Sequence, residues 1–243
     1  MNSSTLPTEA QPQANILTSE RKRDMAGAIR SVTVDGPAGR LEAILNVGAP
    51  DAPFAALLCH PHPIFGGNLH NKVVYHAMKA LNDPEWGLGW PVLRFNFRGM
   101  GRSHGSHDGE AETGDVLAAM DWLEREFRLP LAVAGFSFGA AMALRACSHQ
   151  LRHDVRALIA IGLPTEVSEP AYNCFFLNNL TLPKLFLSGD HDQFAPAAQL
   201  AELVAAAVKP KRLVFVSDAD HFFTDRLEPM QAALAGWLKE QAL

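Results

Sequence analysis

Six almost continuously apolar runs, separated by helical segments, constrain the fold of this 243-residue chain more than any other feature. Runs of this kind are typical of β-strands covered on both faces, and their alternation with helices predicts right-handed βαβ crossovers. The apolar runs are residues 54–60, 91–97, 131–136, 156–162, 184–189 and 212–218. The helical segments are residues 70–82, 112–128, 138–150, 197–208 and 225–240. The chain is therefore predicted to be an α/β protein with a mostly parallel sheet and helices on both faces.

The N-terminal part follows other patterns. Residues 1–24 are rich in Ser, Thr, Gln, Pro and Asn. They contain too few apolar residues for burial to offset the conformational entropy lost on ordering, so we expect a flexible tail. Residues 29–36 and 39–48 are β-patterned and flank the turn sequence DGPAG, which predicts an antiparallel hairpin. Because 48% of the residues are apolar, residues 25–243 can bury a core as one domain.

Charge and composition exclude several classes of function. The formal net charge is −5 and Lys and Arg are scattered, which argues against nucleic-acid binding and favours a small-molecule partner. No run of about 18 apolar residues predicts a membrane span, and the N-terminus lacks the apolar stretch of a signal peptide. Cys59, Cys147 and Cys174 are widely spaced, as is typical of free thiols in a reducing compartment. We expect a cytoplasmic protein, either a monomer or a homodimer.

One serine stands where an apolar run meets a helical segment. The sequence VAGFSFGAAMALRA, residues 133–146, contains the pattern G-x-S-x-G from Gly135 to Gly139, with Ser137 at its centre. A sharp strand-to-helix turn needs small flanking residues and exposes the serine side chain, while the helix start supplies amide dipoles. Ser137 is therefore the candidate nucleophile; the simpler alternative is a serine that caps the helix.

A serine hydroxyl is a weak nucleophile until a base removes its proton, and that base must be oriented by an acid. In this architecture the acid and then the histidine follow the serine along the chain. Asp190 and Asp192 follow the fifth apolar run, and His221 follows the sixth. Because the carboxyl ends of parallel strands meet at one edge of a sheet, these residues are expected near Ser137. His221 is the predicted base; a helix cap for either aspartate, or a solvated loop histidine, is the alternative.

From about Ala28 to its C-terminus, the chain resembles the α/β-hydrolase superfamily. The greatest likeness is to small bacterial serine hydrolases with the motif H-P-H-P-x-x-G-G, present here as HPHPIFGG at residues 60–67. The resemblance implies the α/β-hydrolase fold, with an eight-stranded, mostly parallel sheet. In that family the acid usually lies in a G-x-x-D pattern, which selects Asp192 when counted from Gly189.

The other aspartates fit the role of acid less well. Asp190 is expected to hold its loop instead. Asp220 adjoins His221, and neighbouring side chains rarely face each other, so Asp218 and Asp220 are weaker candidates.

An oxyanion hole needs two N–H donors. The first is expected from the backbone of Phe138, directly after the serine, and the second from the loop after the run 54–60. Pro61 and Pro63 have no N–H, so the amide of His62 is the predicted donor. This loop differs from the glycine-rich H-G-G-type loop of many lipases.

The sequence HPH has an alternative interpretation as a metal site. It would use His60 and His62, together with His70, His104 or His107. No compact set of carboxylates and histidines completes such a site, so neither a metal nor an organic cofactor is expected.

Two further segments bear on the site. The sequence NFRGMGRSHG has His104 where a dinucleotide fingerprint needs glycine, and it resembles the hydrolase turn R-G-x-G-x-S, in which Arg98 and Ser103 are expected to be structural. Residues 164–182 leave room for a short lid rather than a cap domain. Four residues there can line an apolar acyl pocket, or pack as ordinary loop or dimer contacts: Tyr172, Phe175, Phe176 and Leu177.

These residues predict acyl transfer through a covalent intermediate on Ser137, with a small-molecule ester, of short acyl or aryl type, as the expected substrate. An acyltransferase, a peptidase or a cofactor-free perhydrolase can use the same triad, because neither fold nor nucleophile determines the acceptor. A non-catalytic binding protein on the same scaffold is the remaining alternative.

Overall fold

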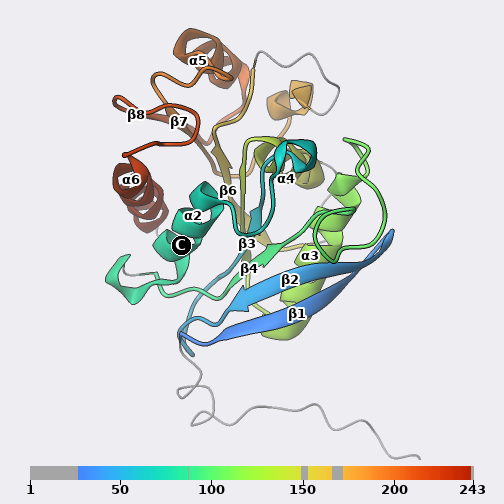
Figure 1. Ribbon diagram of the computed structural model, residues 1–243. Coiled ribbons are helices and arrows are strands. Elements are labelled where there is room, and N and C mark those ends of the chain that lie inside the picture. Colours follow the sequence, from blue (N-terminus) through green and yellow to red (C-terminus); the bar gives the residue numbers. More distant parts are fainter. Residues whose placement is uncertain (1–26, 87, 149–152, 166–171, 242–243) are drawn as a thin grey trace, which may run out of the picture.

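The computed structural model of the chain describes residues 27–86, 88–148, 153–165 and 172–241, and it contains one eight-stranded sheet in the order β1-β2-β4-β3-β5-β6-β7-β8 (Figure 1). The antiparallel hairpin at its edge pairs with β4, also antiparallel, and the other pairs are parallel. The strands are β1 (Ile29–Gly36), β2 (Gly39–Asn46), β3 (Ala55–Cys59), β4 (Val92–Phe95), β5 (Leu131–Phe136), β6 (Val155–Ile161), β7 (Lys184–Gly189) and β8 (Lys211–Val216). The predicted α/β-hydrolase fold is confirmed; the tail predicted for residues 1–24 lies outside the described residues.

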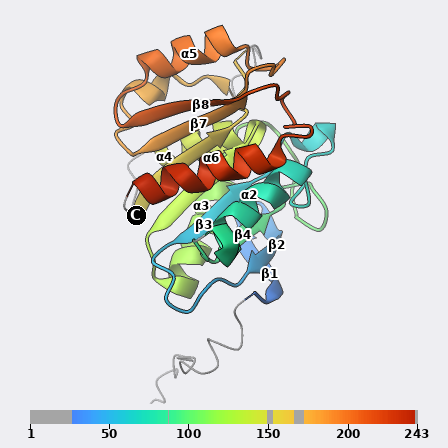
Figure 2. The same cartoon turned by 90° about the vertical axis from the view of Figure 1, so that its left-hand side faces the viewer.

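Helices cover both faces of this sheet. They are α2 (Lys72–Asn82), α3 (Glu112–Phe127), α4 (Phe138–Ser148), α5 (Ala197–Ala206) and α6 (Leu227–Glu240). Helices α2 and α6 lie side by side on one face (Figure 2), and α3, α4 and α5 pack on the other. Three short 3-10 helices, η1 (Pro63–Phe65), η2 (Pro84–Trp86) and η4 (Phe175–Asn178), interrupt the loops.

The two core clusters follow directly from strand periodicity. Along β5, Leu131 and Val133 pack under α3 and α4, whereas Ala132, Ala134 and Phe136 pack under α2 and α6. Because both faces are covered, every residue of this strand is buried, which explains the continuous apolar run.

Local signals set the helix ends. The predicted helix 70–82 begins only at Lys72, because the Asn71 side chain accepts the N–H groups of Val73 and Val74 and so caps it. Helix α3 ends at Phe127, because the C-cap residue Arg128 adopts a left-handed conformation with φ of 56°. None of the helices in the described part of the chain is long and apolar enough to cross a membrane.

Candidate active site

Ser137 stands at the turn between β5 and α4 in a strained backbone conformation. Its φ is +55°, which is unusual for a residue with a side chain, and its N–H donates to the carbonyl of Ile161 at 2.9 Å. The carbonyl of Ser137 accepts the N–H of Ala140 at 2.9 Å, which starts the helix. This geometry directs the chain sharply from strand to helix and leaves the serine on the wall of a cavity.

The two glycines of G-x-S-x-G are required by close backbone approach. A Cβ added to Gly135 would lie 2.2 Å from the carbonyl oxygen of Gly139, so strand and helix could not meet. A Cβ added to Gly139 would lie 2.4 Å from the carbonyl oxygen of Cys59 at the end of β3. The small residues therefore hold the serine turn against the loop that follows β3.

His221 and Asp192 form a buried pair across the ends of β7 and β8. The imidazole Nδ1 lies 3.0 Å from Asp192 Oδ1 and 2.9 Å from Oδ2, although the residues are 29 positions apart. The carboxylate accepts three more hydrogen bonds, from the hydroxyl of Ser188 and from the amides of Phe194 and Ala195. Because the Asp192 carboxylate only accepts hydrogen bonds, it favours the His221 tautomer with the proton on Nδ1. Nε2 is then the basic nitrogen of the ring.

These hydrogen bonds keep the acid ionised. Burial by itself would raise the pKa of Asp192, but the hydrogen bond and charge interaction with His221, together with those from Phe194 and Ser188, outweigh it and lower the pKa. Asp192 therefore remains a carboxylate at neutral pH.

The other aspartates named from the sequence lie elsewhere. Asp190 is exposed beside His191, Asp218 pairs with Arg226, and Asp220 accepts the amides of Phe222 and Thr224. Asp192 is thus the one of the four that bonds to His221 within the described chain.

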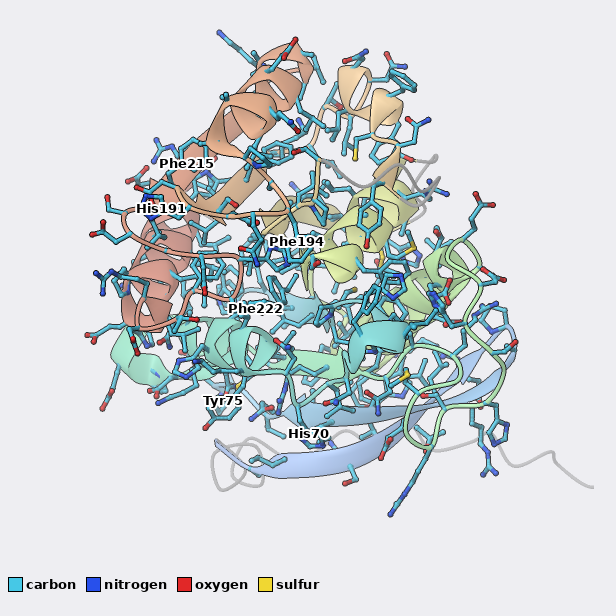
Figure 3. All side chains as sticks on the ribbon, turned by 45° about the horizontal axis from the view of Figure 1, so that its top comes forward. His70, Tyr75, His191, Phe194, Phe215 and Phe222 are labelled. Atoms are coloured by element: carbon cyan, nitrogen blue, oxygen red, sulfur yellow. The ribbon has the colours of Figure 1, made fainter. Side chains whose placement is uncertain are left out.

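A cavity of about 260 Å³ brings Ser137 and His221 together. The described residues that line it are Pro61, His62, Phe65, Gly66, Gly67, Asn71, Ser137, Pro164, Tyr172, Phe194, His221 and Phe222. This wall is rich in aromatic side chains, and none of these lining residues is a Lys, Arg, Asp or Glu. Phe65, Phe194 and Phe222 are 83%, 41% and 48% exposed and form its apolar rim. Figure 3 shows Phe194 and Phe222 near the centre of the face that the view brings forward.

The loop after β3 forms part of the wall of this cavity. His62 has φ of −52° and ψ of 123°, its Nδ1 accepts the N–H of Ile64, and its carbonyl accepts the amides of Phe65 and Gly67. Its ring packs 5.0 Å from that of Phe138, which begins α4. The two residues predicted to supply oxyanion amides are therefore neighbours.

The interpretation of HPH as a metal site does not fit the geometry. The Nδ1 of His60 donates to the carbonyl of Pro61 at 2.6 Å, and its Nε2 accepts the amide of Phe97 at 3.0 Å, so both nitrogens are used. Burial lowers the pKa of His60 to about 4, so the ring is neutral. His60 is therefore a structural residue that ties the β3 loop to the β4 loop. The HPH histidines are not among the potential metal-binding groups of three that the described residues form.

Arg98 and Ser103 are structural, as expected. Arg98 forms a buried bidentate pair with Asp115 of α3, with Nη2 at 2.7 Å from Oδ1. The hydroxyl of Ser103 donates to the carbonyl of Asn96 and accepts the amide of Glu42.

The segment between β6 and β7 is described only in part, since residues 166–171 of the expected lid lie outside the described ranges. Tyr172 lines the cavity, but Leu177 is buried in the core and Phe176 packs against it, while Phe175 is 80% exposed. Of the four residues considered for an acyl pocket, Tyr172 fits that role and two are ordinary core packing.

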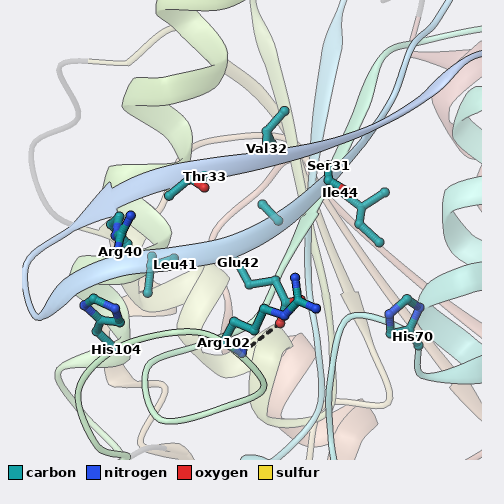
Figure 4. A pocket seen from close by; sticks show the side chains of 11 residues that line it. Ser31, Val32, Thr33, Arg40, Leu41, Glu42, Ile44, His70, Arg102 and His104 are labelled. Atoms are coloured by element: carbon teal, nitrogen blue, oxygen red, sulfur yellow. Dashed lines mark hydrogen bonds between the residues drawn. The ribbon is translucent and has the colours of Figure 1, made fainter.

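A larger concavity of about 540 Å³ lies over the β1–β2 hairpin (Figure 4). It is lined by polar and charged side chains that include Glu42, His70, Arg102 and His104. Neither Ser137 nor His221 lines it, so the smaller cavity is the one that carries reactive groups.

The three cysteines form no disulfide. Burial raises the pKa of Cys147 to about 12 and that of Cys174 to about 11, which keeps both as thiols.

Fold and cavity together define a hydrolase of the α/β type. Residues 66–236 match the alpha/beta hydrolase domain family, to which the chain belongs. It is 35% identical over 213 residues to an uncharacterized protein of Rickettsia prowazekii, with 84% of this chain and 86% of that protein covered.

Two solved structures are similar over most of their length. An α/β serine hydrolase without lid from Xanthomonas campestris is 32% identical, with a TM-score of 0.77 and coverage of 88% of this chain and 94% of that one. An α/β serine hydrolase homologue from Coxiella burnetii is 33% identical, with a TM-score of 0.76 and coverage of 86% and 97%.

Several residues of the site were not found from the sequence. Ser188 has no motif, yet its hydroxyl supports Asp192. Phe65, Phe194 and Phe222 lie within predicted loops, and Asn71 was not singled out although it both caps α2 and lines the cavity. Ser188 lies one residue before the end of the apolar run 184–189, and Phe222 directly follows the predicted base His221, and those positions were the signals available.

Proposed function

We propose that the chain is a serine hydrolase that cleaves a carboxylic ester, with Ser137 as nucleophile, His221 as base and Asp192 as the acid that orients it. The observation that carries this proposal is that Ser137, at φ of +55°, and His221, bonded to a buried carboxylate, line the same cavity. The HPHP-type loop after β3 supplies the second side of the site.

The reaction proceeds through an acyl-enzyme. His221 Nε2 takes the proton of Ser137 as Oγ attacks the ester carbonyl, and the resulting oxyanion accepts hydrogen bonds from the amides of Phe138 and His62. Collapse of the tetrahedral intermediate expels the alcohol, which takes the proton from His221. Water, deprotonated by His221, then attacks the carbonyl carbon of the acyl group and forms a second tetrahedral intermediate. Collapse of this intermediate releases the carboxylic acid, and Ser137 Oγ takes back the proton from His221.

The cavity favours small, uncharged substrates. Its volume of about 260 Å³ lies near the lower end of ordinary ligand sites, and its aromatic wall suits a short acyl or aryl group. Without a cationic side chain among the described wall residues, an anionic substrate would lose hydration and gain no ion pair.

Hydrolysis of p-nitrophenyl acetate, butyrate and octanoate by wild type and Ser137→Ala tests this proposal. We expect wild type to prefer the two shorter esters and Ser137→Ala to lose activity. Product analysis with added alcohols and amines then separates hydrolysis from acyl transfer. A folded wild type that cleaves none of the esters would contradict the proposal and favour a binding role on this scaffold.

A further inference from the structure

A second group of side chains with metal-ligand chemistry lies near the amino-terminal end of the inner strand β6. Asp121 and Glu124 lie on α3, and His153 precedes Val155, the first residue of β6. One potential ligand atom of each residue lies within 4.8 Å of one atom from each of the others. An imidazole nitrogen and carboxylate oxygens are the ligands that divalent transition metals bind in proteins.

The two ring nitrogens of His153 have different surroundings. Nδ1 lies 2.8 Å from Glu124 Oε2, and the other oxygen of that carboxylate accepts the amide of Asp154 at 3.0 Å. Because a carboxylate can only accept, Nδ1 carries the proton in this hydrogen bond. Nε2 is then the ring nitrogen that can offer a lone pair to a metal ion.

Nε2 is the atom that points to a ligand. The side chain of His153 is 1% exposed, and its Nε2 is buried without a hydrogen-bond partner among the described residues. It faces Asp121 Oδ1 at 3.7 Å, which is too long for a hydrogen bond. A metal ion between a ring-nitrogen lone pair and this carboxylate would be attracted to both.

The spacing suits a shared metal ion. Two ligands on one tetrahedral zinc ion, each about 2.0–2.2 Å from the metal, lie roughly 3.4 Å apart. The side chains of Asp121 and Glu124 are 35% and 30% exposed, so an ion can reach the group from solvent.

We propose that Asp121, Glu124 and His153 form a binding site for one divalent transition-metal ion, for which zinc has the fitting ligand chemistry. His153 Nε2 and Asp121 bind the ion, and Glu124 orients the ring through Nδ1. A carboxylate on the far nitrogen is the usual way in which a metal-binding histidine is held. The ion ties α3 to the start of β6 and takes no part in ester cleavage.

Zinc titration of the chelator-treated full chain against a competing chromophoric chelator tests this site. Wild type is expected to bind one equivalent that Asp121→Asn and His153→Gln weaken at least tenfold, and Glu124→Gln by about 10- to 100-fold. The control is His104→Gln, an exposed histidine of the hairpin side, which should bind zinc as wild type does. At zinc a hundredfold above Kd, the melting temperature of wild type should rise by roughly 5–10 °C.

Asp121 is partly exposed, so Asp121→Asn is expected to fold even if replacement of the buried His153 destabilises the chain. Equal zinc affinity and an equal shift in melting temperature for wild type and Asp121→Asn would overturn the site. A folded wild type that binds no zinc would overturn it too.

Discussion

The candidate site has two sides that are built from different interactions. The proposed acid–base side, made of Ser188, Asp192 and His221, is a network of hydrogen bonds around one ionised carboxylate, and His221 is the member that lines the cavity. The proposed oxyanion side, made of residues 60–67 and Phe138, consists of backbone hydrogen bonds and packed rings, with a neutral His60 in its loop.

This difference separates two kinds of sensitivity. On the proposed acid–base side, the side chains themselves would take part in the reaction, so replacing one carboxylate oxygen by an amide nitrogen is expected to lower the rate strongly. On the proposed oxyanion side, backbone N–H groups would be the donors, so loss of an N–H is expected to matter more than loss of a ring.

The largest effect is expected from Asp192→Asn. Four donors face this carboxylate, so the amide NH₂ of asparagine must face one of them. If the amide oxygen stays on the Phe194 and Ala195 amides, NH₂ faces His221 and imposes the tautomer with the proton on Nε2. We expect kcat for p-nitrophenyl acetate to fall by about 10⁴-fold, with little change in KM.

Asp190→Asn is the matched control, because Asp190 is exposed two residues away and outside the cavity wall. A comparable loss in both variants would contradict the assignment of Asp192 as the acid.

A smaller loss is expected from His62→Pro, which removes the backbone N–H. The backbone of His62, with φ of −52° and ψ of 123°, is one that proline adopts, so the loop can keep its course. Removal of one oxyanion donor lowers kcat by about 10²- to 10³-fold. His62→Ala retains the amide and loses only the ring, so its kcat should fall much less. Equal losses in the two variants would show that the ring, not the amide, matters at this position.

The ionised state of Asp192 predicts a pH-dependent stability difference. Its lowered pKa means that the carboxylate stabilises the folded state at neutral pH, and that this contribution is lost as pH falls through the folded pKa. The difference in unfolding free energy between wild type and Asp192→Asn should shrink as pH falls below about pH 4. Urea unfolding at a series of pH values measures it, and a difference that does not change with pH would contradict the hydrogen-bonded carboxylate.

The smallest effect is expected at the rim. Phe65 is 83% exposed, so its ring leaves water mainly when an apolar substrate covers it. Phe65→Ala should lower kcat/KM for p-nitrophenyl butyrate roughly 3- to 10-fold, through KM. Ile64→Ala is the control, because Ile64 is exposed beside it but does not line the cavity. The same loss in both variants would count against a rim contact with substrate.

Much of the fold was predictable because strands buried on both faces leave continuous apolar runs. Strands 29–36, 131–136 and 184–189 are confirmed to the residue, and most observed helix ends lie within two residues of prediction. The position of β4 between β2 and β3 was not predictable, because it depends on pairing between segments distant in sequence.

The site divides in the same way. Ser137, Asp192 and His221 could be selected by motif and chain order, and their geometry fits those roles, which remain predictions until tested. Ser188 and Phe222 could not, since a short hydroxyl or a single loop aromatic has no periodic signal. His60 was considered as a metal ligand because sequence does not show that both of its nitrogens are already bonded.

Ser137 is proposed to carry the acyl group, and mass spectrometry after labelling with a fluorophosphonate probe can detect such a reactive serine. One adduct per chain is expected in wild type, located by peptide mapping on Ser137, and none in a folded Ser137→Ala. An adduct that persists in Ser137→Ala, or maps to another residue of wild type, would contradict the proposal.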